Sequence, residues 1–125
     1  MSNTDPNADL DLSFLYEIAD GSDEFIVESI DMFLQQTPQL VQEIGEGIAS
    51  QNWQATGAAA HKLKPNLGFF GMLSLQSMMQ EIEVLAKGGV PDVAFISDRF
   101  NTAKALIEAN LVKLEQIKAE KGSAS

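Results

Sequence analysis

The sequence predicts an all-α protein: an antiparallel up-and-down four-helix bundle with a short additional helix at its N-terminal end. Apolar residues recur at spacings of three and four along most of the 125 residues, which is the period of helices buried on one side. No run of alternating apolar and polar residues argues for a strand. Short connections join four substantial helical segments, and such connections place successive helices side by side and antiparallel.

The first helical segment is short and covers about residues 10–18, ahead of Asp20 and Gly21. A glycine suits the position after a helix end because it adopts the left-handed conformation without steric cost. Residues 1–9 are polar and contain a proline. We expect them to form a flexible N-terminal tail.

The second helix is expected to begin at Ser22 or Asp23 and to reach about Ile48. Pro38 lies in its interior. Proline lacks the amide hydrogen and its ring crowds the carbonyl four positions earlier, that of Leu34, at a cost of about 3 kcal/mol. A kink or a break is therefore expected at this position.

The third helix is expected to open at Asn52, a residue type that caps helix N-termini well, and to run to about residue 67. Gly68 and Gly71 weaken its end. The fourth helix is expected over residues 75–85, where apolar residues again recur with the helical period.

The clearest turn in the chain follows at residues 87–92, KGGVPD. Asp92 can cap the last helix, which is expected over residues 95–117. The sequence then ends in small and polar residues. We therefore place one bundle domain at residues 10–120 and a flexible C-terminal tail at residues 121–125.

The charge balance limits the classes of partner that the protein is expected to bind. Eighteen acidic and eight basic residues give a net charge of −10, the wrong sign for binding nucleic-acid phosphates or anionic lipids. The chain has no cysteine, which excludes disulfides, thiolate metal sites and cysteine nucleophiles. It shows neither a secretion signal nor a stretch of roughly 18 apolar residues. We expect a cytoplasmic protein that binds neither nucleic acid nor membrane.

His61 is the only histidine, so a site built from several imidazoles of one chain is excluded. On a wheel of about 100° per residue, the core side of its helix is a largely apolar stripe: Thr56, Ala59, Ala60, Leu63, Leu67 and Phe70. His61 lies on the opposite side. A core position is therefore not expected, although an indifferent surface position remains the plain alternative.

Small or compact residues dominate the helix side that carries His61. Its neighbours within about 60° on the wheel are Gly57, Ala58, Lys64, Pro65 and Gly68. A solvated helix face usually carries long polar side chains, and an interior glycine costs roughly 1 kcal/mol relative to alanine. We expect a protein partner to dock on this low surface.

The distribution of charge also singles out His61. From residue 47 to residue 80 the chain has no Asp or Glu, and its only charged side chains are Lys62 and Lys64. Lys64 is a helical neighbour of His61 and can pair with an anion on the ring, whereas Lys62 is expected at the rim of the docking surface. We infer that an acidic protein keeps its acids away from this histidine.

This pattern suits phosphoryl chemistry. Imidazole has an unperturbed pKa of about 6.5, so near neutral pH much of it has a free lone pair and is a competent nucleophile. Attack on a phosphoryl group would bring negative charge to the exposed ring, and the Lys64 ammonium is a suitable counter-ion. The residues indicate a phosphoryl-accepting site with room for a protein partner.

The segment from Ala60 to Gly71, AHKLKPNLGFFG, resembles the motif of the histidine-containing phosphotransfer (HPt) domains of bacterial two-component phosphorelays, A-H-x-L-K-G followed by a further glycine. The resemblance covers about residues 10–117. Three flanking stretches also resemble the family pattern: Phe33-Leu34 followed by Pro38, Asn52-Trp53, and Ile82-Glu83.

The resemblance implies a phosphorelay intermediate. His61 would accept a phosphoryl group on Nε2 from an aspartyl-phosphate of a response-regulator receiver domain and pass it to another receiver aspartate. Lys64 would steady the phosphoryl group and Gly71 would end the helix. The implied partners are receiver domains, including that of a hybrid histidine kinase, and the implied state is a monomer. No bound cofactor or metal is implied, because the magnesium ion belongs to the receiver.

Pro65 departs from the family pattern, which has glycine directly after the lysine. Proline is compact and preserves the low surface. It also removes the amide that would bond the carbonyl of His61, and a bend in the helix is expected.

Two alternatives to a phosphoryl carrier remain. One is a helical adaptor whose smooth face binds receiver or kinase domains without carrying phosphate. The other is a hydrolase that uses His61 as a base, although no nucleophile elbow supports it. An autonomous kinase is not expected, because the sequence has no glycine-rich nucleotide loop. Gln80, on the following helix, is a candidate hydrogen-bond partner of the phosphoryl group if the two helices have the right register.

Overall fold

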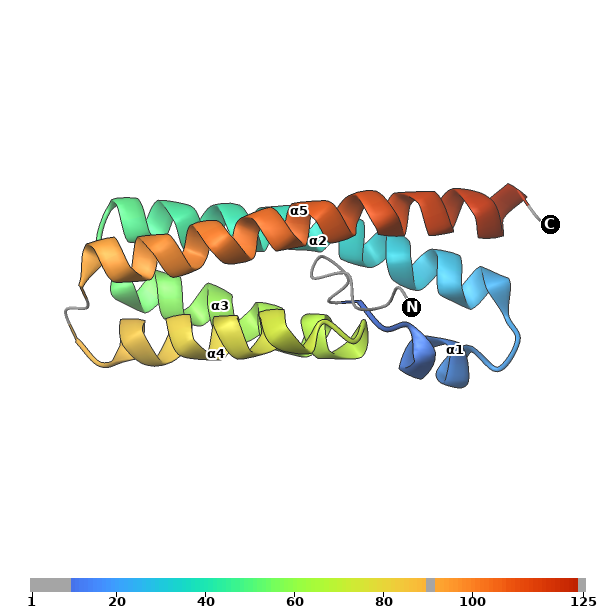
Figure 1. Ribbon diagram of the computed structural model, residues 1–125, viewed down its shortest axis with the longest axis horizontal. Helices are drawn as coiled ribbons and strands as arrows, with labels where there is room; N and C mark the ends of the chain where they lie inside the picture. The colour runs from blue at the N-terminus through green and yellow to red at the C-terminus, as the bar shows by residue number, and fades with distance from the viewer. Residues whose placement is uncertain (1–9, 90–91, 124–125) are drawn as a thin grey trace.

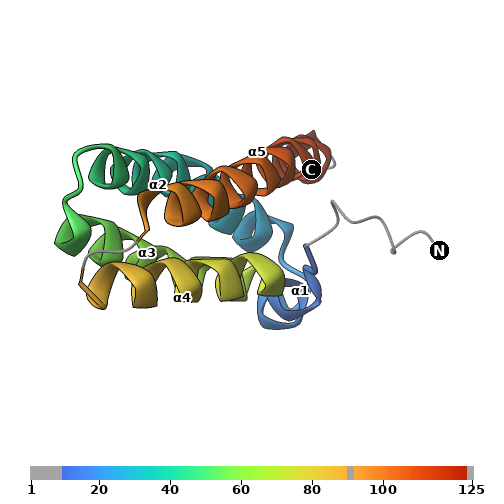
Figure 2. The ribbon, with the colours of Figure 1, turned by 60° about the vertical axis from the view of Figure 1, so that its left-hand side comes forward.

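The computed structural model describes residues 10–89 and 92–123, and this part of the chain forms helices and turns without a strand. The helices are α1 (Ser13–Ala19), α2 (Asp23–Ala49), α3 (Trp53–Phe69), α4 (Leu73–Lys87) and α5 (Val93–Ser123). α2 and α5 form one layer and α3 and α4 the other, as Figure 1 and Figure 2 show. The predicted fold class, a helical bundle with a short N-terminal helix, is confirmed.

The helices of the α2 and α5 layer are longer than those of the α3 and α4 layer, and α1 lies beside the part that extends beyond α3 and α4. α2 has 27 residues and α5 has 31, against 17 for α3 and 15 for α4. At 1.5 Å per residue the first pair is longer by roughly 15 to 20 Å. The extra length projects beyond α3 and α4, and α1 lies beneath it, against the start of α2 (Figure 1).

The helix starts follow the capping residues that the sequence predicted. The Ser22 hydroxyl accepts the amide of Phe25 at 3.1 Å. Asn52 Oδ1 accepts the amide of Ala55 at 3.1 Å. Asp92 Oδ1 accepts two amides at the start of α5, at 3.0 and 3.2 Å. Each cap satisfies backbone donors that the first helical turn cannot pair internally.

Several predicted helix limits differ from the structure, and so does one predicted interruption. A kink or a break was expected at Pro38. The helix does not break there, because α2 continues through Pro38 to Ala49. α5 extends to Ser123, so residues 121–123 are helical and not part of a tail. α1 begins at Ser13, where Asp11 Oδ1 accepts the amide at 3.0 Å. The predicted N-terminal tail, residues 1–9, lies outside the described residues.

The core lies between the two layers and receives side chains from all five helices. Its most deeply buried large side chains are Leu15, Ile30, Ile44, Leu63, Leu67, Met72, Leu75, Met79, Ile82, Ile96, Ile107 and Leu114. Within the described parts of the chain, none of the helices has both the length and the apolar character that a membrane crossing requires.

Gly71 ends α3 and allows the segment before α1 to pack closely against the end of this helix. It adopts a left-handed φ of 71°, its amide donates to Gly68 at 3.0 Å, and the amide of Met72 donates to Leu67 at 2.8 Å. This pair of bonds is a Schellman motif. A Cβ on Gly71 would collide with the backbone of Asp11, so the glycine also lets the segment before α1 pack against the end of α3.

Candidate functional site

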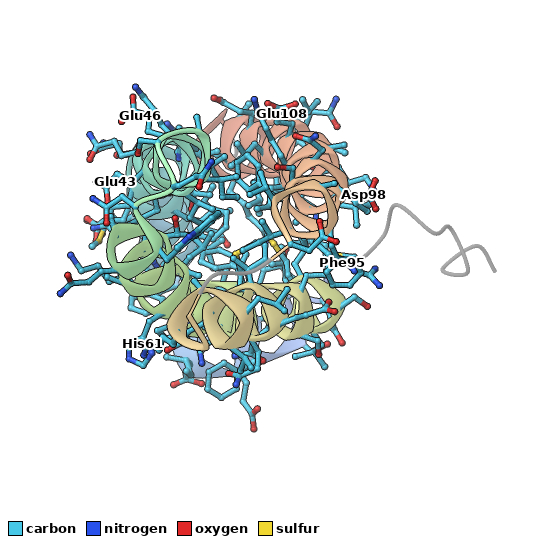
Figure 3. The ribbon with its side chains drawn as sticks, turned by 90° about the vertical axis from the view of Figure 1, so that its left-hand side faces the viewer. Glu43, Glu46, His61, Phe95, Asp98 and Glu108 are labelled. Carbon is cyan, nitrogen blue, oxygen red and sulfur yellow. The ribbon has the colours of Figure 1, made fainter. Side chains whose placement is uncertain are left out.

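His61 lies on the outer side of α3, where α3 meets α4. Its side chain is 65% exposed, while the predicted core stripe of α3 is buried throughout: Thr56, Ala59, Ala60, Leu63, Leu67 and Phe70. The predicted orientation of the helix is therefore confirmed. Seen along the bundle in Figure 3, His61 is on the opposite side from Glu46 and Glu108 of the other layer.

Glu83 of α4 contacts the inner nitrogen of the His61 ring. Glu83 Oε2 lies 2.9 Å from His61 Nδ1, and the glutamate side chain is only 8% exposed. The site therefore combines an exposed imidazole with a buried carboxylate from the neighbouring helix.

Two lysines hold the Glu83 carboxylate from either side. Lys64 Nζ lies 2.7 Å from Oε1 and Lys87 Nζ lies 2.6 Å from Oε2. The hydrogen bond from Lys64, then that from Lys87, with a smaller one from His61, lower the pKa of Glu83 from 4.5 to about 2, against the opposing effect of burial. The carboxylate is therefore ionised at neutral pH.

An ionised carboxylate fixes the tautomer of the neutral His61 ring. It has no proton to donate, so Nδ1 must carry the hydrogen of the Nδ1 to Glu83 bond. The lone pair of the neutral ring then belongs to Nε2. The nitrogen left free as a nucleophile is thus the one that points away from α4.

Glutamines from α4 position Lys64. Its ammonium donates to Gln80 Oε1, and Gln76 Nε2 donates to the Lys64 carbonyl at 3.2 Å. The Lys64 side chain is 20% exposed as a result of this packing. The register thus brings Gln80 to Lys64, and through it to the site.

The predicted docking residues do not all face the open surface. Ala58, Lys62 and Pro65 are exposed, as expected for a low surface around the histidine. Gly57 is buried, because Lys87 and Ala86 of α4 pack over it. This placement corrects the expectation that Gly57 belongs to the docking face.

Gly68 is also partly covered by α4. A Cβ at this position would lie 2.5 Å from Gln76 Nε2, so the glycine provides the space through which Gln76 reaches the carbonyl of Lys64. Its small size serves contact between α3 and α4 as well as a low surface.

Pro65 is tolerated within α3. The helix continues beyond it to Phe69, although Pro65 offers no amide to the carbonyl of His61. Its exposed ring lies between Lys64 and the next turn, where it lines an open depression of about 480 Å³ together with Gln76, Ser77 and Gln80.

The expectation that acids stay away from His61 is wrong. The absence of Asp and Glu from residues 47 to 80 is real, but Glu83 reaches the ring from α4 just beyond that range. Glu83 and Lys87, both missed as site residues, are spaced four apart on one helix face, which is a recognisable pairing signal. Linking that pair to His61 needed the register of α4 against α3.

No cluster of three or more His, Asp or Glu side chains suitable for a metal ion occurs among residues 10–89 and 92–123. A second open depression, of about 440 Å³, is lined by all four charged or ionisable members of the site, His61, Lys64, Glu83 and Lys87. The concentration of positive charge there suits an anion.

The bundle thus presents one solvent-facing imidazole together with an orienting carboxylate and two flanking lysines, a set of groups suited to nucleophilic chemistry on an anion. The model of the Hpt domain family matches residues 28–119 of the chain. The protein belongs to this family, whose members carry phosphoryl groups in phosphorelays and interact with receiver domains. Comparison with curated proteins finds no match, and comparison with solved structures finds none either.

Proposed function

We propose that His61 accepts a phosphoryl group from the aspartyl-phosphate of a receiver domain and passes it to an aspartate of another receiver. The observation that carries the proposal is the contact between His61 Nδ1 and Glu83. It leaves Nε2 with the lone pair, and the 65% exposure of the ring leaves it accessible to a protein partner.

In the accepting step, the Nε2 lone pair forms a bond to phosphorus while the bond from phosphorus to the receiver's carboxylate oxygen breaks. The carboxylate leaves with the electron pair. Nδ1 keeps its proton, and the positive charge that develops on the ring faces the ionised Glu83. The reverse displacement, by a carboxylate of the next receiver, returns the electron pair to Nε2.

Charge and positioning supply the remaining chemistry. Phosphoryl transfer needs little covalent help from the protein beyond alignment and neutralisation of the phosphoryl oxygens. Lys64 lies one helical turn from His61 and is held by Gln80 and Glu83, so its ammonium is positioned for these oxygens. The magnesium ion of the reaction belongs to the receiver in this proposal.

The chain acts as a carrier and not as an autonomous kinase, since its sequence contains no glycine-rich nucleotide loop. It acts as a monomer, and the exposed surface around His61 formed by Ala58, Lys62 and Pro65 docks the receiver, including that of a hybrid kinase.

Incubation with phosphorylated receiver domains tests the proposal. The wild-type protein should acquire an acid-labile phosphoryl group, and His61→Gln should acquire none. Lys104→Gln, at an exposed lysine of α5, is the matched surface control and should behave as wild type. Receiver binding that is indifferent to His61→Gln, with no label on wild type, would instead identify an adaptor.

A further inference from the structure

Lys87 shares an oxygen atom with the nucleophilic histidine. Its Nζ lies 2.6 Å from Glu83 Oε2, and the same oxygen lies 2.9 Å from His61 Nδ1. Lys64 takes the other oxygen at 2.7 Å. Two ammonium groups, one from α3 and one from α4, therefore bracket a single carboxylate beside the ring.

The two lysines differ in their freedom to move. The Lys64 side chain is 20% exposed and that of Lys87 is 60% exposed. The stem of Lys87 crosses Gly57, whose missing side chain leaves Lys87 Cγ 3.4 Å from the place that a Cβ would occupy. A flexible four-carbon stem on this flat surface allows the ammonium to move without disturbing the core.

Phosphorylation would change the charge balance of this cluster. With a neutral ring, two ammonium groups face one carboxylate. A phosphoryl group adds up to about two negative charges and strong acceptor oxygens. Lys87 lines the same open depression as His61 and Lys64, so its ammonium is within reach of a group on the ring.

We propose that Lys87 is a second phosphoryl-binding residue. Its ammonium pairs with Glu83 while His61 is unmodified, and it moves from Glu83 to the phosphoryl oxygens when His61 is phosphorylated. The inference rests on the proposed function. Its consequence is thermodynamic: Lys87 raises the share of phosphoryl groups that reside on this chain and not on the receiver.

The test measures the equilibrium of phosphoryl groups between a receiver and this chain. Loss of a charge-assisted hydrogen bond in Lys87→Gln should shift the equilibrium toward the receiver by about tenfold. Lys87→Arg should largely restore it, and Lys104→Gln should leave it unchanged. Thermal unfolding of each variant checks that the fold is intact.

A second readout avoids the receiver. The chain is phosphorylated chemically with phosphoramidate and followed by phosphorus NMR, where Lys87→Gln should change the phosphohistidine shift and shorten its lifetime. An unchanged equilibrium and resonance in Lys87→Gln, with phosphorylated wild type, would overturn the role of Lys87 alone. A wild type that accepts phosphate from neither donor would overturn the proposed function as well.

Discussion

Glu83 is the residue that determines which nitrogen of the neutral His61 ring carries the lone pair. A surface histidine alone exchanges its proton between both ring nitrogens. Bonded to Glu83 at 2.9 Å, the neutral ring keeps its hydrogen on Nδ1. The carboxylate can hold this role at neutral pH because Lys64 and Lys87 keep its pKa near 2.

Substitution of Glu83 should therefore change the tautomer and the reaction together. In Glu83→Gln the charge is lost and the amide can either accept from or donate to Nδ1, so the rate of phosphoryl acceptance should fall about 10- to 100-fold. Nitrogen NMR of the His61 ring should show Nδ1–H in wild type and a mixed population in the variant. Glu81→Gln, which removes a carboxyl directed at Arg99 3.5 Å away, is the control. A predominant Nε2–H form in wild type would contradict the argument.

At the scale of helices, the sequence predicts each element better than it predicts how two elements meet. Apolar spacing and caps locate α3 and orient its stripe, since both are properties of one helix. The contact of Glu83 with His61 depends on how α4 is rotated and translated against α3. One residue of error turns a helix by about 100°, enough to point Glu83 away from the site.

The buried Gly57 illustrates the same limit. Its place on the helix wheel of α3 correctly puts it on the side of His61, yet α4 covers it with Ala86 and Lys87. A single-helix wheel does not show which part of a face a neighbouring helix occupies. Ala58, Lys62 and Pro65 are exposed on this side of α3, whereas Gly57, which faces α4, is buried.

Two glycines of the helix pair α2 and α3 should respond oppositely to alanine. A Cβ on Gly57 would meet Lys87 and Ala86 at 3.4 Å or more, so Gly57→Ala should stabilise by about 0.5 to 1 kcal/mol through helix propensity. A Cβ on Gly47 would collide with the Thr56 hydroxyl and crowd backbone atoms of Thr56 and Asn52. Gly47→Ala should destabilise by about 1 to 3 kcal/mol. Urea unfolding of both variants measures the two signs, and equal effects would refute the packing argument.

At the scale of the whole molecule, Glu83 is an exception among the acidic residues, because it contacts His61. The net charge of −10 is carried in part by acids of the α2 and α5 layer, such as Glu46 and Glu108, which lie on the side opposite His61 (Figure 3). The overall charge does not reveal that one acid, Glu83, is buried at the site. That acid is compensated by two lysines, so the surface near His61 stays positive.

The buried Glu83 should also make the stability of the whole bundle depend on pH in acid. Its pKa is about 2 in the folded protein against 4.5 as the ordinary value. A depressed pKa contributes stability that is fully present above the unfolded value, and that stability is lost as the pH falls from about 4.5 to about 2. At 1.36 kcal/mol per unit, the contribution is at most about 3 kcal/mol.

Urea unfolding at several pH values tests this linkage. Wild type should exceed Glu83→Gln in unfolding free energy at pH 7, and the difference should shrink steadily below about pH 4.5. Glu43→Gln, at an exposed carboxyl of α2, should show a much smaller difference at pH 7. A gap between wild type and Glu83→Gln that stays constant down to about pH 2 would mean that the lost stability comes from packing, and that the two lysines do not hold a charged glutamate in the fold.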